Sequence, residues 1–263
     1  MGSLEIIGGD APSGGGGGGA SFVTLKDLDL TDLTTVSAIT SGTSTLQFDS
    51  SADTLSITVT RFSGANGDVT PTNGASGGLV MNGGTSSGTV TASLDLDPLL
   101  SSYTRSDVSA HIYCVHLVVE AVSYPSSGNS TIFTGLNKGT NTTHNGGEGR
   151  GWFIEDAGDA TNEVFKVRSN TSNSSVLATT AIKTSRVFSY ILIGGAIVEV
   201  MDTSGTTLPT PAPGGASTTT VGGDAVGLND STPIYQADGL RLFFGAADQM
   251  DGRLTRLVIQ RYQ

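Results

Sequence analysis

The sequence predicts an all-β protein, a two-sheet antiparallel sandwich of the jelly-roll type. Three observations predict it. The composition is dominated by Gly (37 of 263 residues), Ser and Thr, which favour turns and strands over helices. Short apolar clusters recur along the chain, with turn residues between them. No segment of about 20 to 50 residues repeats, which argues against solenoids and propellers.

Charge and cysteine content exclude several classes of partner and site. The net charge is −11, from 13 basic and 24 acidic side chains, so nucleic acid is a poor partner. No run of about 18 apolar residues could cross a membrane as a helix. Since there is one Cys, neither an intrachain disulfide nor a Cys-rich zinc site can form. The residues after Met1 do not resemble a secretory signal.

Residues 1–21 form a glycine-rich segment that we expect to be an N-terminal arm. It contains six consecutive glycines, 14–19, and glycine loses the most conformational entropy when it is ordered. We therefore expect the arm to be flexible in isolation and ordered only where another protein holds it. Leu4, Ile6 and Ile7 precede the glycines and are the residues that we expect to anchor the arm to a partner.

Residues 22–263 follow as a single predicted domain. Leucines at 25, 28, 30 and 33 fit either a helical turn or a strand, and the alternation of Asp27 and Asp29 favours the strand. Leu55, Ile57 and Val59 alternate with Ser and Thr, which predicts a half-buried strand.

The second half of the domain continues the strand pattern. Residues 112–122 are apolar at nearly every position, which predicts a central strand covered on both faces. Pro209, Pro211 and Pro213 predict a stiff extended loop. About a dozen strands and no long helix are expected in all. The remaining strands of this half are predicted at 152–154, 164–167, 187–193, 197–201, 240–245 and 254–262.

The final 75 or so residues resemble the concanavalin A-like (laminin-G-like) jelly-roll family. Segment 187–193 followed by 197–205 is similar to its paired strands and tight turn, and 239–245 followed by 250–259 is similar to its closing strands. Residues 132–135 and 151–154 resemble its middle strands, so the resemblance covers roughly 45–263. It implies the fold but does not decide the function, because the family includes lectins, glycan hydrolases, adhesion modules and viral surface proteins.

The whole chain also resembles tailed-bacteriophage virion proteins in its glycine-rich arm, its Ser/Thr/Asn-rich loops and its scarcity of Lys. This resemblance implies a non-enzymatic structural protein of the capsid-decoration, head-fibre or knob type. We then expect it to be made in the host cytoplasm and to lie on the virion surface. Its partners would be other capsid or tail proteins and sister subunits in a homo-oligomer, with no cofactor.

A carbohydrate-binding adhesin or receptor-binding module on the same fold is the alternative. Exposed aromatic rings would then stack on a host-surface glycan. Tyr103, Tyr124 and Tyr235 lie in loop-like contexts and are the candidates for stacking, although the same positions also suit ordinary packing.

The sequence predicts no catalytic residues. Glycan hydrolysis needs two carboxylates, and hydrolases of this fold carry them in a Glu-x-Asp-x-x-Glu strand. The acidic cluster of this chain has a different spacing and suggests a solvated turn; its members are Glu155, Asp156, Asp159 and Glu163. Segment 84–88 matches Gly-x-Ser-x-Gly. That motif needs a helix after the serine, and 89–94 predicts a strand instead.

No metal site is predicted either. Cys114 and His116 share one face of a predicted strand and His111 lies on the other, so the three do not converge. We expect Cys114 to be a small buried side chain and His116 to be a core or strand-surface histidine. Oxygen atoms of loop residues could bind calcium, and the candidates are Asp224, Asn229, Asp230, Asp248 and Asp251. Asp and Asn are also common in ordinary turns, where their side chains accept hydrogen bonds from the nearby backbone.

Overall fold

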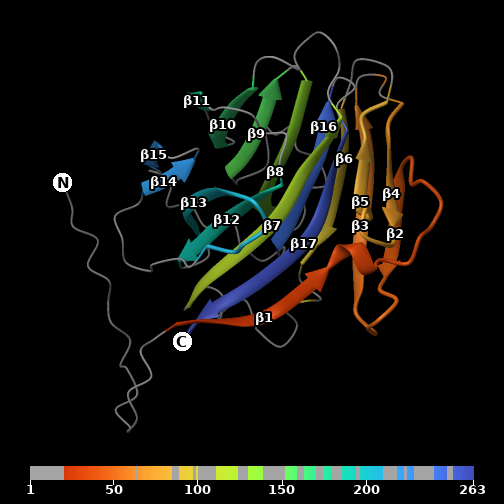
Figure 1. The fold of residues 1–263 in the computed structure, drawn as a ribbon, viewed down its shortest axis with the longest axis horizontal. Helices are drawn as coiled ribbons and strands as arrows, with labels where there is room; N and C mark the ends of the chain where they lie inside the picture. The colour runs from red at the N-terminus through yellow and green to blue at the C-terminus, as the bar shows by residue number, and fades with distance from the viewer. Residues whose placement is uncertain are drawn as a thin grey trace, which may run out of the picture.

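Two β-sheets face each other across an apolar core in the computed structural model of the protein (Figure 1). Seventeen strands and one short 3-10 helix occur in the residues that the structure describes. These residues are 21–62, 64, 66–84, 89–96, 99, 111–123, 130–138, 152–158, 163–169, 174–178, 185–193, 196–209, 218–221, 224–227, 240–247 and 251–263.

One sheet has nine strands and the other has eight. The nine-stranded sheet has the order β15 (Asp224–Gly227), β14 (Thr218–Val221), β13 (Ala196–Ser204), β12 (Arg186–Ile193), β7 (Ile112–Ser123), β17 (Asp251–Tyr262), β5 (Gly78–Asn82), β4 (Asp68–Thr72), and β1 (Phe22–Asp29) also pairs with β17. The eight-stranded sheet has the order β11 (Ser174–Ala178), β10 (Glu163–Ser169), β9 (Trp152–Gly158), β8 (Ser130–Lys138), β16 (Leu240–Ala247), β6 (Thr89–Asp95), β3 (Thr54–Phe62), β2 (Gly42–Gln47).

The chain passes repeatedly between the sheets. Neighbours in sequence such as β12 and β13 pair within one sheet, whereas β5 to β6, β6 to β7 and β16 to β17 each cross to the other sheet. Every pairing between the described strands is antiparallel except that of β13 with β14, which are parallel. The predicted all-β, two-sheet antiparallel sandwich is therefore confirmed.

The alternation of side chains along each strand determines which residues face the core. In β3, Leu55, Ile57 and Val59 are buried between the sheets, and the Ser and Thr between them are half-buried on the other face, as predicted. β7 differs because it is buried on both faces. Tyr113, Val115, Leu117 and Val119 belong to the central core, and Cys114, His116 and Val118 on the opposite face are also buried. The prediction of a central strand covered on both faces is confirmed.

The N-terminal leucines lie partly in a strand and partly in a helical turn, the two structures that their spacing fits. β1 ends at Asp29, and a 3-10 helix follows at Leu30–Asp32. The Asp29 carboxylate accepts a hydrogen bond from the Thr31 N–H and so caps this turn. Strand and turn therefore both occur, in that order, and Leu28, Leu30 and Leu33 are all buried in the core.

Two details of the strand prediction are wrong. β9 continues to Gly158, so Glu155 and Asp156 lie inside a strand rather than in the expected solvated turn. They pair with Lys166 and Phe165 of β10, because the strand extends past the apolar residues that marked it in the sequence. The prediction also missed six strands of four to six residues each, which are β2, β4, β5, β11, β14 and β15.

The two ends of the domain pair with each other. β1 runs antiparallel to the C-terminal half of β17 (Figure 1), and Ser21 and Gln263 exchange both backbone hydrogen bonds, at 2.9 and 3.0 Å. Residues 1–20 lie outside the described residues. Ser21, the last residue of the predicted arm, already belongs to the paired structure.

Candidate functional site

Polar side chains gather on one face of the nine-stranded sheet, the face turned away from the core. We call it the outer face of that sheet. Its members come from β12, β7, β17 and β1, which lie side by side, and alternation along each strand brings them to this face. They are Ser189, His116, Glu120, Arg253, Arg256, Gln260, Asp27 and Thr24.

His116 is the centre of a hydrogen-bonded chain that crosses four strands. Its Nε2 lies 2.9 Å from the Gln260 Oε1, and its Nδ1 lies 2.7 Å from the Ser189 Oγ. The Gln260 amide nitrogen donates to the Thr24 Oγ1 at 3.2 Å, so its oxygen faces the imidazole. This network assigns the proton to Nε2, with Nδ1 accepting from Ser189.

Burial keeps this histidine neutral. Desolvation lowers the pKa of His116 below its ordinary value, the hydrogen bond to Gln260 opposes this shift, and the positive charge of Arg256 adds to it. His116 and Ser189 are both fully buried. A Ser–His pair resembles part of a hydrolase triad. Here, however, the serine is buried away from any substrate, and the third group of the chain is the Gln260 amide instead of a carboxylate. Cys114 is buried, as expected from the sequence, and so is His116, for which the sequence left a core and a strand-surface position open.

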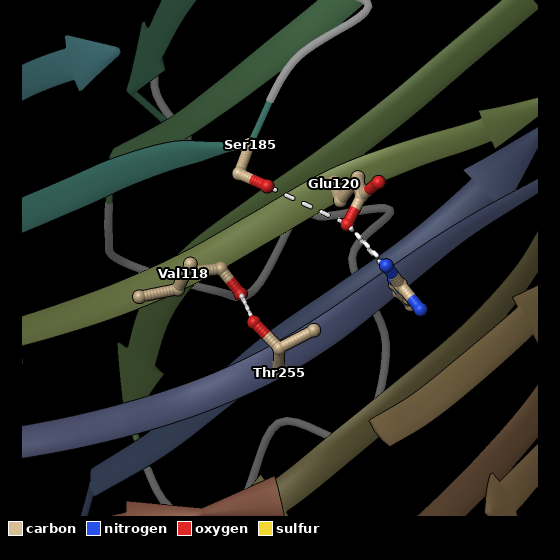
Figure 2. Close-up of polar contacts among 5 residues, drawn as sticks. Val118, Glu120, Ser185 and Thr255 are labelled. Carbon is tan, nitrogen blue, oxygen red and sulfur yellow. Dashed lines mark hydrogen bonds and ion pairs between the residues drawn. The ribbon is translucent and has the colours of Figure 1, made fainter. Parts of the chain in front are cut away.

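Glu120 and Arg253 form a second polar contact on the outer face. The Arg253 Nε and Nη2 donate to the same carboxylate oxygen of Glu120, at 2.9 and 2.6 Å. Figure 2 shows Ser185, which reaches that oxygen from the start of β12 at 3.5 Å. Both members of the ion pair are less than a third exposed, so salt and solvent screen their attraction less than that of a fully exposed pair.

A bulge in β17 lies directly beside this pair. The register against β7 shifts between Leu254 and Arg256, and the Thr255 hydroxyl donates to the Val118 carbonyl at 3.3 Å (Figure 2). Gly78 of β5 lies against the same bend with a φ of 122°, and a Cβ there would come 2.7 Å from the Leu254 carbonyl oxygen. Glycine is therefore required at 78.

Arg256 and Asp27 connect the edge strand β1 to β17. The guanidinium donates to both oxygens of the carboxylate, at 2.8 and 2.6 Å. The hydrogen bond from Arg256 lowers the pKa of Asp27, and partial burial opposes that shift. Asp27 is thus a carboxylate that holds the edge strand and is not a candidate acid catalyst.

Many carboxylates of the described residues have structural partners. Asp32 accepts from the backbone and hydroxyl of Ser50, and Asp53 pairs with Lys26 at 2.9 Å. Asp251 accepts from the Gly83 N–H at 3.0 Å, so this carboxylate joins the start of β17 to the residue that follows β5. Within the described ranges, no group of three or more His, Cys, Asp or Glu side chains is placed to hold a metal ion.

The residues predicted for partner and glycan binding lie outside the described residues: Leu4, Ile6, Ile7, Tyr103, Tyr124 and Tyr235. So do Asp159 of the acidic cluster, the serines of segment 84–88, and Asn229, Asp230 and Asp248. β6 follows segment 84–88, so a strand stands where the hydrolase motif needs a helix, as predicted.

Sequence reasoning missed the Glu120–Arg253 pair and the Ser189–His116–Gln260 chain. Their members are 133, 73 and 144 residues apart, so no local motif joins them. The available signal was the presence of His116 and Glu120 within an otherwise apolar strand, since a buried polar side chain needs a partner on a neighbouring strand.

No protein-family model and no curated protein matches the chain. Among solved structures it is similar to one of botulinum neurotoxin type C, whose cell entry is described as dependent upon interaction with two ganglioside molecules; the identity is 10% and the TM-score 0.37. It is also similar to the binding domain of botulinum neurotoxin DC in complex with rat synaptotagmin II, at 11% identity and a TM-score of 0.37.

Both matches cover 88% of this chain and 48% of the toxin chain, so the protein spans about half the length of either. A likeness at this TM-score carries no inference about function. In the part of the chain that the structure describes, no helix has the length and apolar character needed to span a membrane.

Proposed function

We propose that the protein is a non-enzymatic structural component of a tailed-bacteriophage virion, of the capsid-decoration, head-fibre or knob type. Residues 1–20 attach it to capsid or tail proteins and to sister subunits, and the sandwich is displayed on the particle surface. The concanavalin A-like family assignment and a homo-oligomeric state belong to the same proposal.

The pairing of Ser21 with Gln263 supports this proposal most directly. It places the exit of residues 1–20 and the C-terminus at one end of the sandwich. A module attached through that end would leave the rest of its surface facing outward. Since β1 is held along its length by β17, a pull on the N-terminal segment would be borne by the sheet.

The chemistry of the outer face supports a non-catalytic role. Its histidine is buried and neutral, and its carboxylates at 27 and 120 each bind a guanidinium. General acid-base catalysis needs such groups to reach a substrate. Groups engaged in this way stabilise a sheet instead.

The test is incorporation of altered chains into particles. We expect the triple change Leu4→Ser, Ile6→Ser, Ile7→Ser to reduce incorporation strongly and to leave the thermal midpoint of the isolated protein unchanged. Val36→Ser is the matched control, because Val36 is an exposed apolar residue of the sandwich itself. If the triple variant enters particles as well as the control does, the proposed attachment is wrong.

A further inference from the structure

The second edge of β1 is open. β1 pairs with β17 through one edge, and no other strand within the described ranges pairs with it. Ser21 and Gln263 exchange both backbone hydrogen bonds, so the next pair of this kind in the antiparallel ladder is the one at Val23. The backbone N–H and C=O groups of Phe22 and Thr24 therefore point away from β17, toward the open edge.

The first half of this edge is uncharged and partly apolar. Edge strands are commonly protected by charged side chains, and β1 has these only in its second half, at Lys26, Asp27 and Asp29. In the first half, Val23 is 41% exposed, which is unusual for a large apolar residue in the described part of the chain. Residues 22–25 are therefore accessible for the addition of a strand.

The edge of β4 shows the contrast. Ile39 and Val69 exchange both backbone hydrogen bonds, at 2.8 and 3.1 Å, and the Val36 N–H donates to the Pro71 carbonyl at 3.4 Å. Segment 36–39 thus covers the edge of β4. No described segment covers the edge of β1 in this way.

Residues 4–7 have a pattern that matches the open edge. They follow the order apolar, polar, apolar, apolar, and residues 25 to 22, taken in the reverse direction, follow the same order. An antiparallel alignment then places apolar residues opposite apolar ones, which favours pairing. The pairs are Leu4 with Leu25, Glu5 with Thr24, Ile6 with Val23, and Ile7 with Phe22. β1 bulges at residue 25, so the regular ladder would span the last three pairs.

We propose that residues 4–7 of one copy add to the open edge of β1 in a second copy, as an antiparallel strand. The inference rests on the proposed attachment role of residues 1–20 and names a sister subunit as the partner. The occupant is a second copy because Val23 stays exposed in the single chain and the edge beside it has no strand partner there. Residues 8–20 span about 40 Å when extended, which is enough to reach a neighbouring sandwich.

Cysteine cross-linking between two different variants tests the proposal. Isotope-labelled, full-length Ile6→Cys is mixed with unlabelled, full-length Val23→Cys under mild oxidation, so a disulfide between these positions can form only between chains. In the proposed ladder the two residues are a non-hydrogen-bonded pair, whose Cα atoms lie about 4.5 Å apart, within the range of about 4.4 to 6.8 Å that a disulfide spans. Cys114 is buried and stays in both variants.

Val36→Cys is the matched control, because Val36 is 40% exposed but lies beside β4. We expect Ile6→Cys to cross-link to Val23→Cys at least about fivefold more than to Val36→Cys, since only a paired position stays within disulfide reach. Glu5→Cys should cross-link to Val23→Cys less than Ile6→Cys does, because neighbouring residues of a strand point to opposite faces. Equal yields in either comparison would overturn the proposal.

Thr24→Pro tests the backbone pairing itself. In the Val23→Cys chain it removes an N–H that points to the open edge, and we expect the cross-link to Ile6→Cys to decrease. Thr24→Val is its control, because it loses the same hydroxyl contact with Gln260 but keeps the N–H. Equal cross-linking in the two variants would contradict strand addition.

Two further outcomes separate this inference from the proposed function. If the cross-link forms within one chain of the double variant Ile6→Cys, Val23→Cys but not between the mixed variants, residues 4–7 bind their own sandwich, and both proposals fail. If no cross-link forms while the triple variant Leu4→Ser, Ile6→Ser, Ile7→Ser is still excluded from particles, residues 1–20 bind a different virion protein. The inference is then wrong, although the proposed function stands.

Discussion

Arg256 of β17 holds both carboxylate oxygens of Asp27 in β1, at 2.8 and 2.6 Å, across 229 residues of sequence. This contact joins the first strand of the sandwich to the last. The neighbouring contact of Gln260 with Thr24 joins the same two strands. The edge from which residues 1–20 depart is therefore fixed by side chains as well as by the backbone ladder.

Asp27→Asn should weaken this edge only slightly. The side chains of Asp27 and Arg256 are 44% and 39% exposed, so solvent screens their attraction and the loss should stay below about 1 kcal/mol. Because the pKa of folded Asp27 lies below its ordinary 3.8, the stabilisation is present above pH 3.8 and is lost as the pH falls through the folded value. Urea unfolding at pH 7 and below pH 3 checks this, and a larger penalty in acid than at pH 7 would contradict it.

Arg253→Ala should cost more than Asp27→Asn. The Glu120 carboxylate would lose both guanidinium hydrogen bonds while staying partly buried, which should lower the free energy of unfolding by about 1.5 to 3 kcal/mol. Arg253→Lys keeps the charge without the two-point contact and should fall between wild type and Arg253→Ala. An unchanged urea midpoint for Arg253→Ala would show that the pair does not stabilise the sheet.

His116 should make the protein less stable in weak acid. Burial lowers its folded pKa, so above pH 6.5 it is neutral in both states. As the pH falls below 6.5 the unfolded chain binds a proton that the folded chain does not. The free energy of unfolding should then decrease by up to about 1.4 kcal/mol per pH unit, until the folded pKa is reached.

His116→Gln is the variant that isolates this effect. It should be less stable than wild type at pH 8, because the chain from Ser189 to Gln260 is interrupted, but it should lack the additional slope below pH 6.5. Denaturant unfolding at a series of pH values measures both quantities. A slope equal to that of wild type would assign the acid sensitivity to other groups.

Thr91→Val should stabilise the protein. The Thr91 Oγ1 in β6 is buried and has no hydrogen-bond partner among the described residues, and valine has nearly the same shape without the hydroxyl. The gain should be about 1 kcal/mol, since an unsatisfied buried hydroxyl is removed. Thr58→Val is the matched control, because the Thr58 hydroxyl lies 3.1 Å from that of Thr43 in a hydrogen bond. A destabilised Thr91→Val would mean that the hydroxyl has a role in the fold.

The carbohydrate-binding alternative predicts glycan binding that depends on Tyr103, Tyr124 and Tyr235. A glycan array with the wild-type chain and with each Tyr→Ala variant tests it. Binding that is lost in these variants and kept in a Tyr113→Phe control would favour the adhesin, since Tyr113 belongs to the core. The virion proposal predicts that the array shows no tyrosine-dependent binding.

Much of the fold follows from local sequence. Alternation in β3 and the apolar run of β7 predict strands that the structure confirms, because burial on one or both faces leaves a direct pattern in the sequence. The single turn at Leu30–Asp32 could not be separated from a strand, since leucine spacing fits both.

The polar contacts of the outer face could not be predicted. Glu120 meets Arg253 only because β7 and β17 are neighbours in a particular register, and a bulge after Leu254 shifts that register. A shift of one residue would reverse which side chains face outward. Such pairing depends on the packing of the whole sandwich and not on the residues next to Glu120.

The most direct test of the proposed attachment is a structure of the assembled particle that shows the contacts of Leu4, Ile6 and Ile7. We predict that these three side chains are packed against a different polypeptide, a capsid or tail protein or a neighbouring copy. If they instead lie on the sandwich of their own chain, with no other protein touching them, the attachment role is contradicted.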